Sequence, residues 1–253
     1  AIATVSAQVI ALLWQLKQFN NANELLHFRR GIFRLKRKIV FDSLAIGMSP
    51  FLMNLAACLI VILINQGLKK YGGDLAIGAF GIVNRLVFIV VMIVMGLNQG
   101  MQPIAGYNFG AKLYDRVNKV LKLTIIYATC VTTFGFLVGM LAPNLVVGIF
   151  TSDAELTELS ATGLRITVMF FPIIGFQMVT SNFFHSIGMA GKAIFLSLTR
   201  QMLILLPCLL ILPHFFGVAG VWYSMPVSDL LASLIALVML VYQFRKFKTA
   251  AAH

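Results

Sequence analysis

Long apolar runs alternate with short polar segments along most of this chain. The runs lie at residues 44–68, 75–111, 123–141, 166–188, 193–212 and 218–244. Each is close to or longer than the ~20 residues that an α-helix needs to cross the hydrocarbon core of a bilayer. The pattern predicts an all-α fold in which six helices form one polytopic transmembrane bundle. The short connections favour antiparallel neighbours.

The chain before the first of these runs divides into two parts. Residues 1–16 are apolar but short, and we interpret them as the end of a preceding transmembrane helix. Residues 17–40 carry many Lys and Arg side chains against the single acid Glu24, and we interpret them as a basic cytoplasmic linker. Residues 41–248 then form the six-helix lobe. Because the chain opens on Ala1 inside an apolar run, we expect it to be a piece of a longer protein.

Composition and charge support a membrane protein. Hydrophobic residues make up 60% of the chain and charged residues 11%, too few to cover a soluble domain of this length. The net charge of +12 suggests a nucleic-acid partner. However, the basic residues gather between the apolar runs, where membrane topology places them, so no nucleic-acid partner is expected.

The distribution of Lys and Arg between the loops predicts the orientation in the membrane. When successive loops are assigned to alternate sides, one side collects all of the 20 Lys and Arg residues except Lys69, Lys70, Arg85 and Arg165. That side is predicted to be cytoplasmic, together with the linker and the C-terminus.

Local motifs predict how some of the helices turn and pack. Residues 69–74, which include two glycines, predict a tight turn between the first two runs. Gly135 and Gly139 form a small-xxx-small face that lets membrane helices approach closely. Thr151 or Ser152 is predicted to cap a helix that enters the membrane.

Several amides lie at membrane depth. Residues 96–112 end the second run, and Gln99 and Gln102 within them suggest a protein-lined cavity or a close helix contact. Hydrocarbon would penalise them, because a polar group without a partner costs several kcal/mol there. The alternative is a helix end at which these amides meet lipid headgroups. Asn54 in the first run and Asn182 in the fourth are further amides of this kind.

Asp229 is the acidic residue that lies deepest in a run. It follows Val218 by eleven residues, about 16 Å along a helix, near the middle of a ~30 Å core. A charged, unpaired carboxylate is costly at that depth, which makes Asp229 a candidate proton or cation site. The structural alternative is a protonated carboxyl group hydrogen-bonded to a neighbouring helix. We interpret Arg85, Arg165 and Arg200 as anchors whose long side chains reach an interface.

Prolines recur in five runs or at their ends, which suggests helices bent around a cavity. They are Pro50, Pro103, Pro172, Pro207 and Pro226. The candidate cavity residues are Asp229, Asn54, Gln99, Gln102 and Asn182. No cluster of His, Cys and carboxylates has metal-ligand spacing and no phosphate-binding glycine loop occurs, so we expect neither an enzyme nor a metal site nor an organic cofactor.

Residues 96–112 resemble the multidrug and toxic compound extrusion (MATE) family of bacterial efflux transporters. The resemblance is carried by Gln102-Pro103, Gly106-Tyr107-Asn108 and Gly110-Ala111-Lys112, and it extends over residues 39–247. Similar later motifs are Phe183-Phe184-His185-Ser186-Ile187-Gly188, Thr199-Arg200-Gln201 with Pro207, and Phe216-Gly217-Val218-Ala219-Gly220-Val221-Trp222 leading to Pro226 and Asp229.

The resemblance implies two six-helix lobes joined by a cytoplasmic linker in the bacterial inner membrane. This chain would be the C-terminal lobe plus the end of the preceding helix, and its partners would be the N-terminal lobe, membrane lipid and a small organic substrate. The implied activity is drug/cation antiport, in which amphipathic compounds are exported by alternating access, driven by sodium or protons.

The coupling ion and two alternative functions stay open. Some family members carry a carboxylate in the first helix of this lobe, whereas residues 44–68 have none and Asn54 is their deepest polar residue, so the coupling ion is open between sodium and a proton. One alternative function is a flippase for lipid-linked saccharides of the same superfamily, whose lumen would be richer in Arg and Lys. Another is a non-transporting membrane subunit.

Overall fold

A computed structural model describes residues 2–20 and 36–251 of the chain. Most of these residues are helical, and no β-strand occurs among them. The chain divides into two compact units, Ala1–Pro50 and Phe51–His253. The all-α prediction is therefore confirmed.

The first unit contains helix α1 (Ile2–Phe19) and the beginning of helix α2 (Arg37–Gly110). Helix α1 corresponds to the apolar segment predicted at 1–16 and continues to Phe19. Most of the predicted linker, residues 21–35, lies outside the described residues. The first lobe helix begins at Arg37, before the predicted boundary at residue 41.

Helix α2 is two membrane crossings joined at a sharp break. Its apolar stretch Asn54–Gly110 has 57 residues, and an unbroken helix of that length would be about 86 Å long, far more than a ~30 Å hydrocarbon core. The break is at Gly73, where φ is 68° and ψ is −163°, a conformation that a residue with a Cβ rarely adopts. Gly73 lies inside the turn predicted at 69–74. We call the parts before and after Gly73 the first and second arms of α2.

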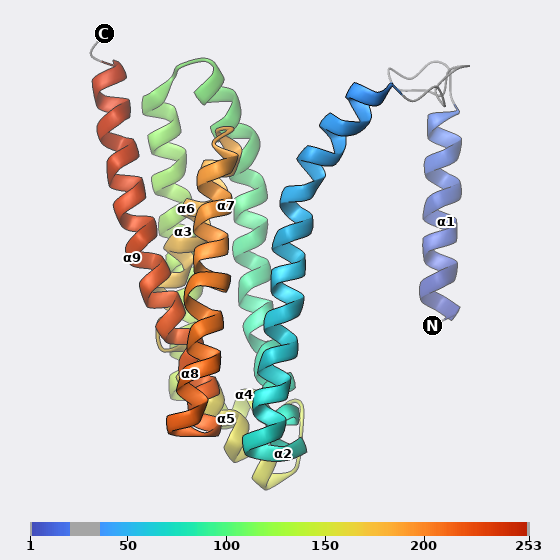
Figure 1. Ribbon diagram of the computed structural model, residues 1–253, viewed down its shortest axis with the longest axis vertical. Helices are drawn as coiled ribbons and strands as arrows, with labels where there is room; N and C mark the ends of the chain where they lie inside the picture. Colours follow the sequence, from blue (N-terminus) through green and yellow to red (C-terminus); the bar gives the residue numbers. More distant parts are fainter. Residues whose placement is uncertain (1, 21–35, 252–253) are drawn as a thin grey trace. The chain divides into compact units, whose positions relative to one another are not determined.

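The second unit continues with further helices. They are α3 (Tyr114–Leu141), α4 (Pro143–Gly148), α5 (Ala154–Val168), α6 (Phe171–Ser186), α7 (Ala190–Leu198), the π-helix η1 (Thr199–Leu205), α8 (Leu206–Phe216) and α9 (Val218–Ala251). Of these, α3, α6, α9 and the column formed by α7 and α8 run alongside one another (Figure 1). The α2–α3 and α6–α7 turns lie at one end of this unit, and the bend of α2 and the α8–α9 turn lie at the other (Figure 1). Neighbouring crossings therefore alternate in direction, as the short connections predicted.

The sequence predicts a single helix over 166–188 as the fourth crossing, whereas the structure has two helices there. Helix α5 already begins at Ala154, and α5 and α6 are bent by 54° at the break between them. Pro172, in the first turn of α6, has no N–H to continue the hydrogen-bond ladder of α5. The predicted cap is also wrong, because Asp153 is the N-cap of α5 and its Oδ1 accepts from Leu156 N at 2.9 Å. Thr151 instead accepts a hydrogen bond from Asp153 N.

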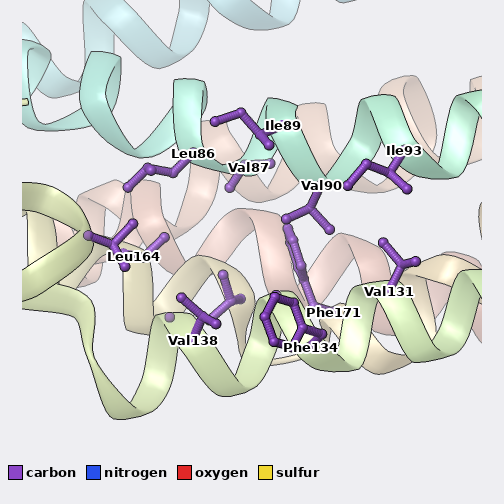
Figure 2. Close-up of a pocket in the computed structure, with 14 residues that line it drawn as sticks. Leu86, Val87, Ile89, Val90, Ile93, Val131, Phe134, Val138, Leu164 and Phe171 are labelled. Atoms are coloured by element: carbon purple, nitrogen blue, oxygen red, sulfur yellow. The ribbon is translucent and has the colours of Figure 1, made fainter. Parts of the chain in front are cut away.

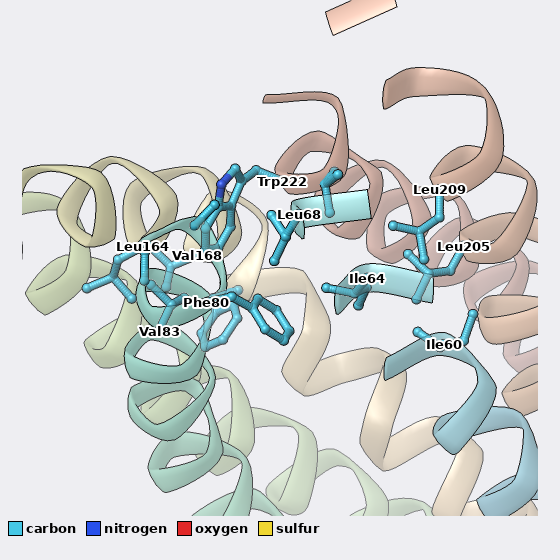
Figure 3. Packing of buried hydrophobic residues seen from close by; sticks show 14 of the residues in the cluster. Ile60, Ile64, Leu68, Phe80, Val83, Leu164, Val168, Leu205, Leu209 and Trp222 are labelled. Carbon is cyan, nitrogen blue, oxygen red and sulfur yellow. The ribbon is translucent and has the colours of Figure 1, made fainter. Parts of the chain in front are cut away.

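One apolar cluster contains residues from both arms of α2 and from other crossings (Figure 3). Ile64 and Leu68 of the first arm and Phe80 of the second arm lie in it together with Trp222 of α9. The Phe80 and Trp222 rings are 5.9 Å apart. This cluster positions α9 against both arms of α2.

The small-residue face predicted on α3 is present and meets two elements. A Cβ added to Gly135 would lie 2.9 Å from Val90 Cγ2 in the second arm of α2. One added to Gly139 would lie 3.0 Å from Val168 Cγ2 in α5. Both glycines therefore permit helix approaches that a larger residue would obstruct.

Counting crossings in the described residues confirms the polytopic bundle. Four helical stretches are long and apolar enough to cross a membrane, and the bent pair α5–α6 would make a fifth. The break at Gly73 divides the longest stretch into two crossings. With that division, the described residues provide the six crossings that the sequence predicts.

Candidate functional site

A π-helical segment places an arginine in the middle of the fifth crossing. Arg200 follows the start of the apolar stretch Gly191–Phe216 by nine residues, about 14 Å along the axis. It belongs to η1, the seven-residue π-helix between α7 and α8. Pro207 follows this segment and cannot donate to the backbone ladder. Wide π turns shift the side-chain register of a helix and are frequent at functional sites.

Asp229 lies at a comparable depth on α9, three residues after Pro226. Its side chain is almost fully buried, with 6% of its surface exposed. The neighbouring hydroxyls bond to the backbone of their own helix, because Ser228 donates to Met225 O and Ser233 donates to Asp229 O. The carboxylate is therefore left to the helix opposite.

Arg200 and Asp229 form an ion pair across the two helices. Nε of Arg200 donates a hydrogen bond of 2.7 Å to Oδ1 of Asp229, and Nη2 makes an ion-pair contact with the same oxygen at 2.7 Å. The pair satisfies a charged carboxylate that would be costly alone at this depth. The prediction that Arg200 is an interface anchor is thus wrong, since its guanidinium binds a buried acid in the membrane interior.

The ion pair lines a cavity of about 270 Å³ inside the second unit. Both arms of α2 and α5, α6, η1 and α9 contribute side chains to it. Most of the wall is apolar, including Ile60, Val87 and Phe171. The polar lining residues are Asn84, Thr167, Arg200, Gln201, Ser228 and Asp229. A mostly apolar cavity with a few converging polar groups is the usual form of a small-molecule site, although this one is slightly smaller than most.

The structure places the five sequence candidates in different surroundings. Asp229 lines the cavity, whereas Asn54, Gln99, Gln102 and Asn182 are not among its described lining residues. Asn54 and Gln99 are exposed and Gln102 is half-buried. Asn182 donates to Met178 O within α6 at 3.0 Å.

Sequence reasoning missed several residues of this site. Asn84 and Gln201 line the cavity but were not among the candidates, and Arg200 was assigned to the interface. A signal for Arg200 was present, since it is a charged residue in the middle of an apolar run seven residues before Pro207. Among the amides of 96–112, Asn98 and Asn108 are the buried ones. Asn108 donates to Ile104 O, whereas neither side-chain atom of Asn98 has a hydrogen-bond partner among the described residues.

A second pocket, of about 220 Å³, is lined only by apolar residues and glycines (Figure 2). It lies between the second arm of α2, α3 and α5, with Phe134 and Phe171 at its wall. It offers no polar group that could orient a ligand. Of these two pockets, the cavity at Arg200 and Asp229 is the candidate functional site, because it alone combines apolar walls with polar groups.

The fold and this site define a polytopic α-helical membrane protein with a charged cavity in the membrane interior. The profile of the MatE family matches residues 45–211. The chain therefore belongs to the MatE (MATE) family of membrane transporters, as the motifs at 96–112 indicated.

Individual relatives agree with this assignment. The multidrug export protein MepA of Staphylococcus haemolyticus is 26% identical over 249 residues, which are 97% of this chain and 53% of MepA. MepA of Staphylococcus aureus shows the same identity and coverage. The solved structure of the MATE multidrug transporter DinF-BH is 35% identical, with a TM-score of 0.81 over 97% of this chain and 55% of that chain. The chain thus spans about half the length of the relatives that it matches.

Proposed function

We propose that this chain is one lobe of a drug/cation antiporter that exports amphipathic organic compounds by alternating access. The observation that supports the proposal best is the buried Asp229 beside Arg200 in a mostly apolar cavity. Apolar walls suit the body of an amphipathic molecule, and an intramembrane carboxylate marks ion pathways in many transporters.

Asp229 is the proposed site at which the coupling ion acts. A proton or a sodium ion at its carboxylate would compete with Arg200 for Oδ1 and change the net charge of the cavity. Among its described lining residues, Arg200 and Asp229 are the only charged ones, so one added cation alters the cavity from neutral to positive. Ion occupancy would thereby be coupled to ligand affinity.

The proposed partner is a second six-helix lobe, which would supply the opposite wall of the translocation pathway. This proposal is supported by relatives about twice as long as the region they share with this chain. The proposed location is the bacterial inner membrane, with the linker and the C-terminus in the cytoplasm because the basic loops gather on that side.

The flippase alternative is not favoured. A lumen that binds lipid-linked pyrophosphate would be rich in Arg and Lys, whereas the cavity has Arg200 as its single cationic residue among those described, and Asp229 already pairs with it. A non-transporting subunit would not need a charged cavity inside the membrane.

Transport by the Asp229→Asn variant tests the proposal. The complete gene product that contains this chain is expressed, and uptake of the dye rhodamine 6G into inside-out vesicles is followed under an imposed proton or sodium gradient. We expect Asp229→Asn to lower gradient-driven uptake at least about fivefold, a typical coupling effect, with unchanged membrane insertion. Asp115→Asn, which removes an exposed carboxylate from the first turn of α3, is the matched control and should transport normally. Unchanged uptake in Asp229→Asn would remove this residue from the mechanism.

A further inference from the structure

We propose that Arg200 determines the ligand class of the cavity, and that the cavity prefers an amphipathic molecule carrying a carboxylate over the same molecule without one. The preferred ligand would be a zwitterion whose carboxylate meets the Arg200 guanidinium. This inference rests on the proposed function and specifies its substrate class.

The two charges of the ion pair are unequally accessible. The Asp229 side chain is 6% exposed, whereas the Arg200 side chain is 33% exposed. Both the hydrogen bond and the ion-pair contact from Arg200 end on a single oxygen, Oδ1. A ligand that enters the cavity therefore meets the cationic partner first.

Arg200 retains unused hydrogen-bond donors. A guanidinium has five N–H groups; the hydrogen bond to Asp229 uses the one on Nε, and Nη2 contacts the same oxygen as an ion pair. Nη1 makes no hydrogen bond within the described parts of the chain. The planar fork of a guanidinium matches a carboxylate and is weakly hydrated, so it binds this group well in an apolar surrounding.

The other lining residues add no competing charge. Arg200 and Asp229 sum to zero, and the remaining polar groups described at the wall are neutral, including Gln201 and Ser228. A simple organic cation would approach an exposed guanidinium while the balancing carboxylate is covered. Like charges repel strongly at the low dielectric of such a site. A ligand carboxylate at Arg200 removes that repulsion.

Two rhodamines provide a matched probe pair for the test. Rhodamine 6G is an ethyl ester and a cation, and rhodamine 19 is the corresponding free acid and a zwitterion with the same ring system. The complete gene product is reconstituted in nanodiscs, and the dissociation constant of each dye is measured by fluorescence anisotropy. The ratio of the two constants within one variant is independent of how much of that variant is correctly folded.

Substitutions of Arg200 and of Asp229 should shift the ratio of the two dissociation constants in opposite directions. Wild type should bind the acid more tightly than the ester. Arg200→Gln should shift the ratio toward the ester by about tenfold or more. This shift corresponds to the loss of one charge-assisted hydrogen bond between the guanidinium and the carboxylate of the acid. Asp229→Asn should shift it further toward the acid. Arg116→Gln, which removes an exposed positive charge near the start of α3, should leave the ratio unchanged.

Three outcomes would overturn the inference. They are an unchanged ratio in Arg200→Gln, shifts of the same sign in Arg200→Gln and Asp229→Asn, and failure of wild type to bind either dye. The vesicle uptake experiment is read separately. Gradient-driven uptake without a ratio shift would retain the proposed transport and reject the role of Arg200. The same uptake assay is therefore also run with rhodamine 19, and a ratio shift without uptake of either dye would retain the role of Arg200 and reject the proposed transport.

Discussion

Gly163 of α5 lies directly against the indole of Trp222 in α9, and this contact predicts an unusual cost for a mild substitution. A Cβ added to Gly163 would lie 2.7 Å from both Cη2 and Cζ2 of Trp222 and 2.9 Å from Cζ3. Trp222 is 3% exposed and packs in the cluster of Figure 3 at 5.9 Å from the Phe80 ring. The indole therefore has little room to move away.

The magnitude follows from two opposing effects in Gly163→Ala. Carbon atoms prefer separations of about 3.5 Å or more, so the indole or α5 must move by roughly 0.8 Å. Overpacking a tight core costs about 1–3 kcal/mol. Alanine in place of glycine inside a helix stabilises the folded protein by about 1 kcal/mol. The net loss of stability is then roughly 0–2 kcal/mol.

Gly81→Ala is the matched control. Gly81 also lies inside a helix, but a Cβ there meets nothing within 4 Å. This variant should gain about 1 kcal/mol from helix propensity alone. The two substitutions should therefore differ by about 1–3 kcal/mol, the steric cost at Trp222.

The assay is the amount of monodisperse protein that remains after heating nanodisc samples, measured by size-exclusion chromatography. Gly163→Ala should lose its monodisperse fraction at a lower temperature than Gly81→Ala. Trp222→Phe removes most of the six-membered part of the indole, so on that background the two alanine variants should behave alike. Equal midpoints of Gly163→Ala and Gly81→Ala in the wild-type background would refute the steric argument.

Two further contacts predict measurable effects. Lys192 Nζ donates to Gln243 Oε1 at 2.5 Å and lies 5.3 Å from the centre of the Phe184 ring. Lys192→Met should destabilise the protein in the same heating assay by about 1–3 kcal/mol, because Gln243 is then buried without this donor. Gln243→Leu on that background should recover part of the loss, and no recovery would show that the stem of Lys192 rather than its ammonium matters. Asp153→Ala should cost about 1 kcal/mol and raise amide hydrogen exchange in the first turn of α5, while Asp153→Ser should retain protection. Unchanged exchange at Leu156 in Asp153→Ala would contradict the cap.

The sequence predicted local features of the fold, such as turns and close helix approaches, where a single residue determines the backbone conformation. The turn predicted at 69–74 contains Gly73, whose positive φ breaks α2. Gly135 permits the close approach that its spacing predicted, against Val90. Pro172 was recognised as a bending residue, but the length of α5 before it was not, because acidic and polar residues near residue 155 hid a helix that begins outside the apolar run.

The sequence by itself determined that this is a membrane protein with six crossings, because crossing a bilayer requires apolar runs of fixed length that are visible without any contact. It also marked Asp229 as unusual. Only the tertiary structure decided what Asp229 faces. Arg200 lies 29 positions away on another helix, and the π turn around it alters the side-chain direction that a regular helix would give. A pairing between helices depends on their packing and rotation, and the residue pattern of either helix alone does not contain it.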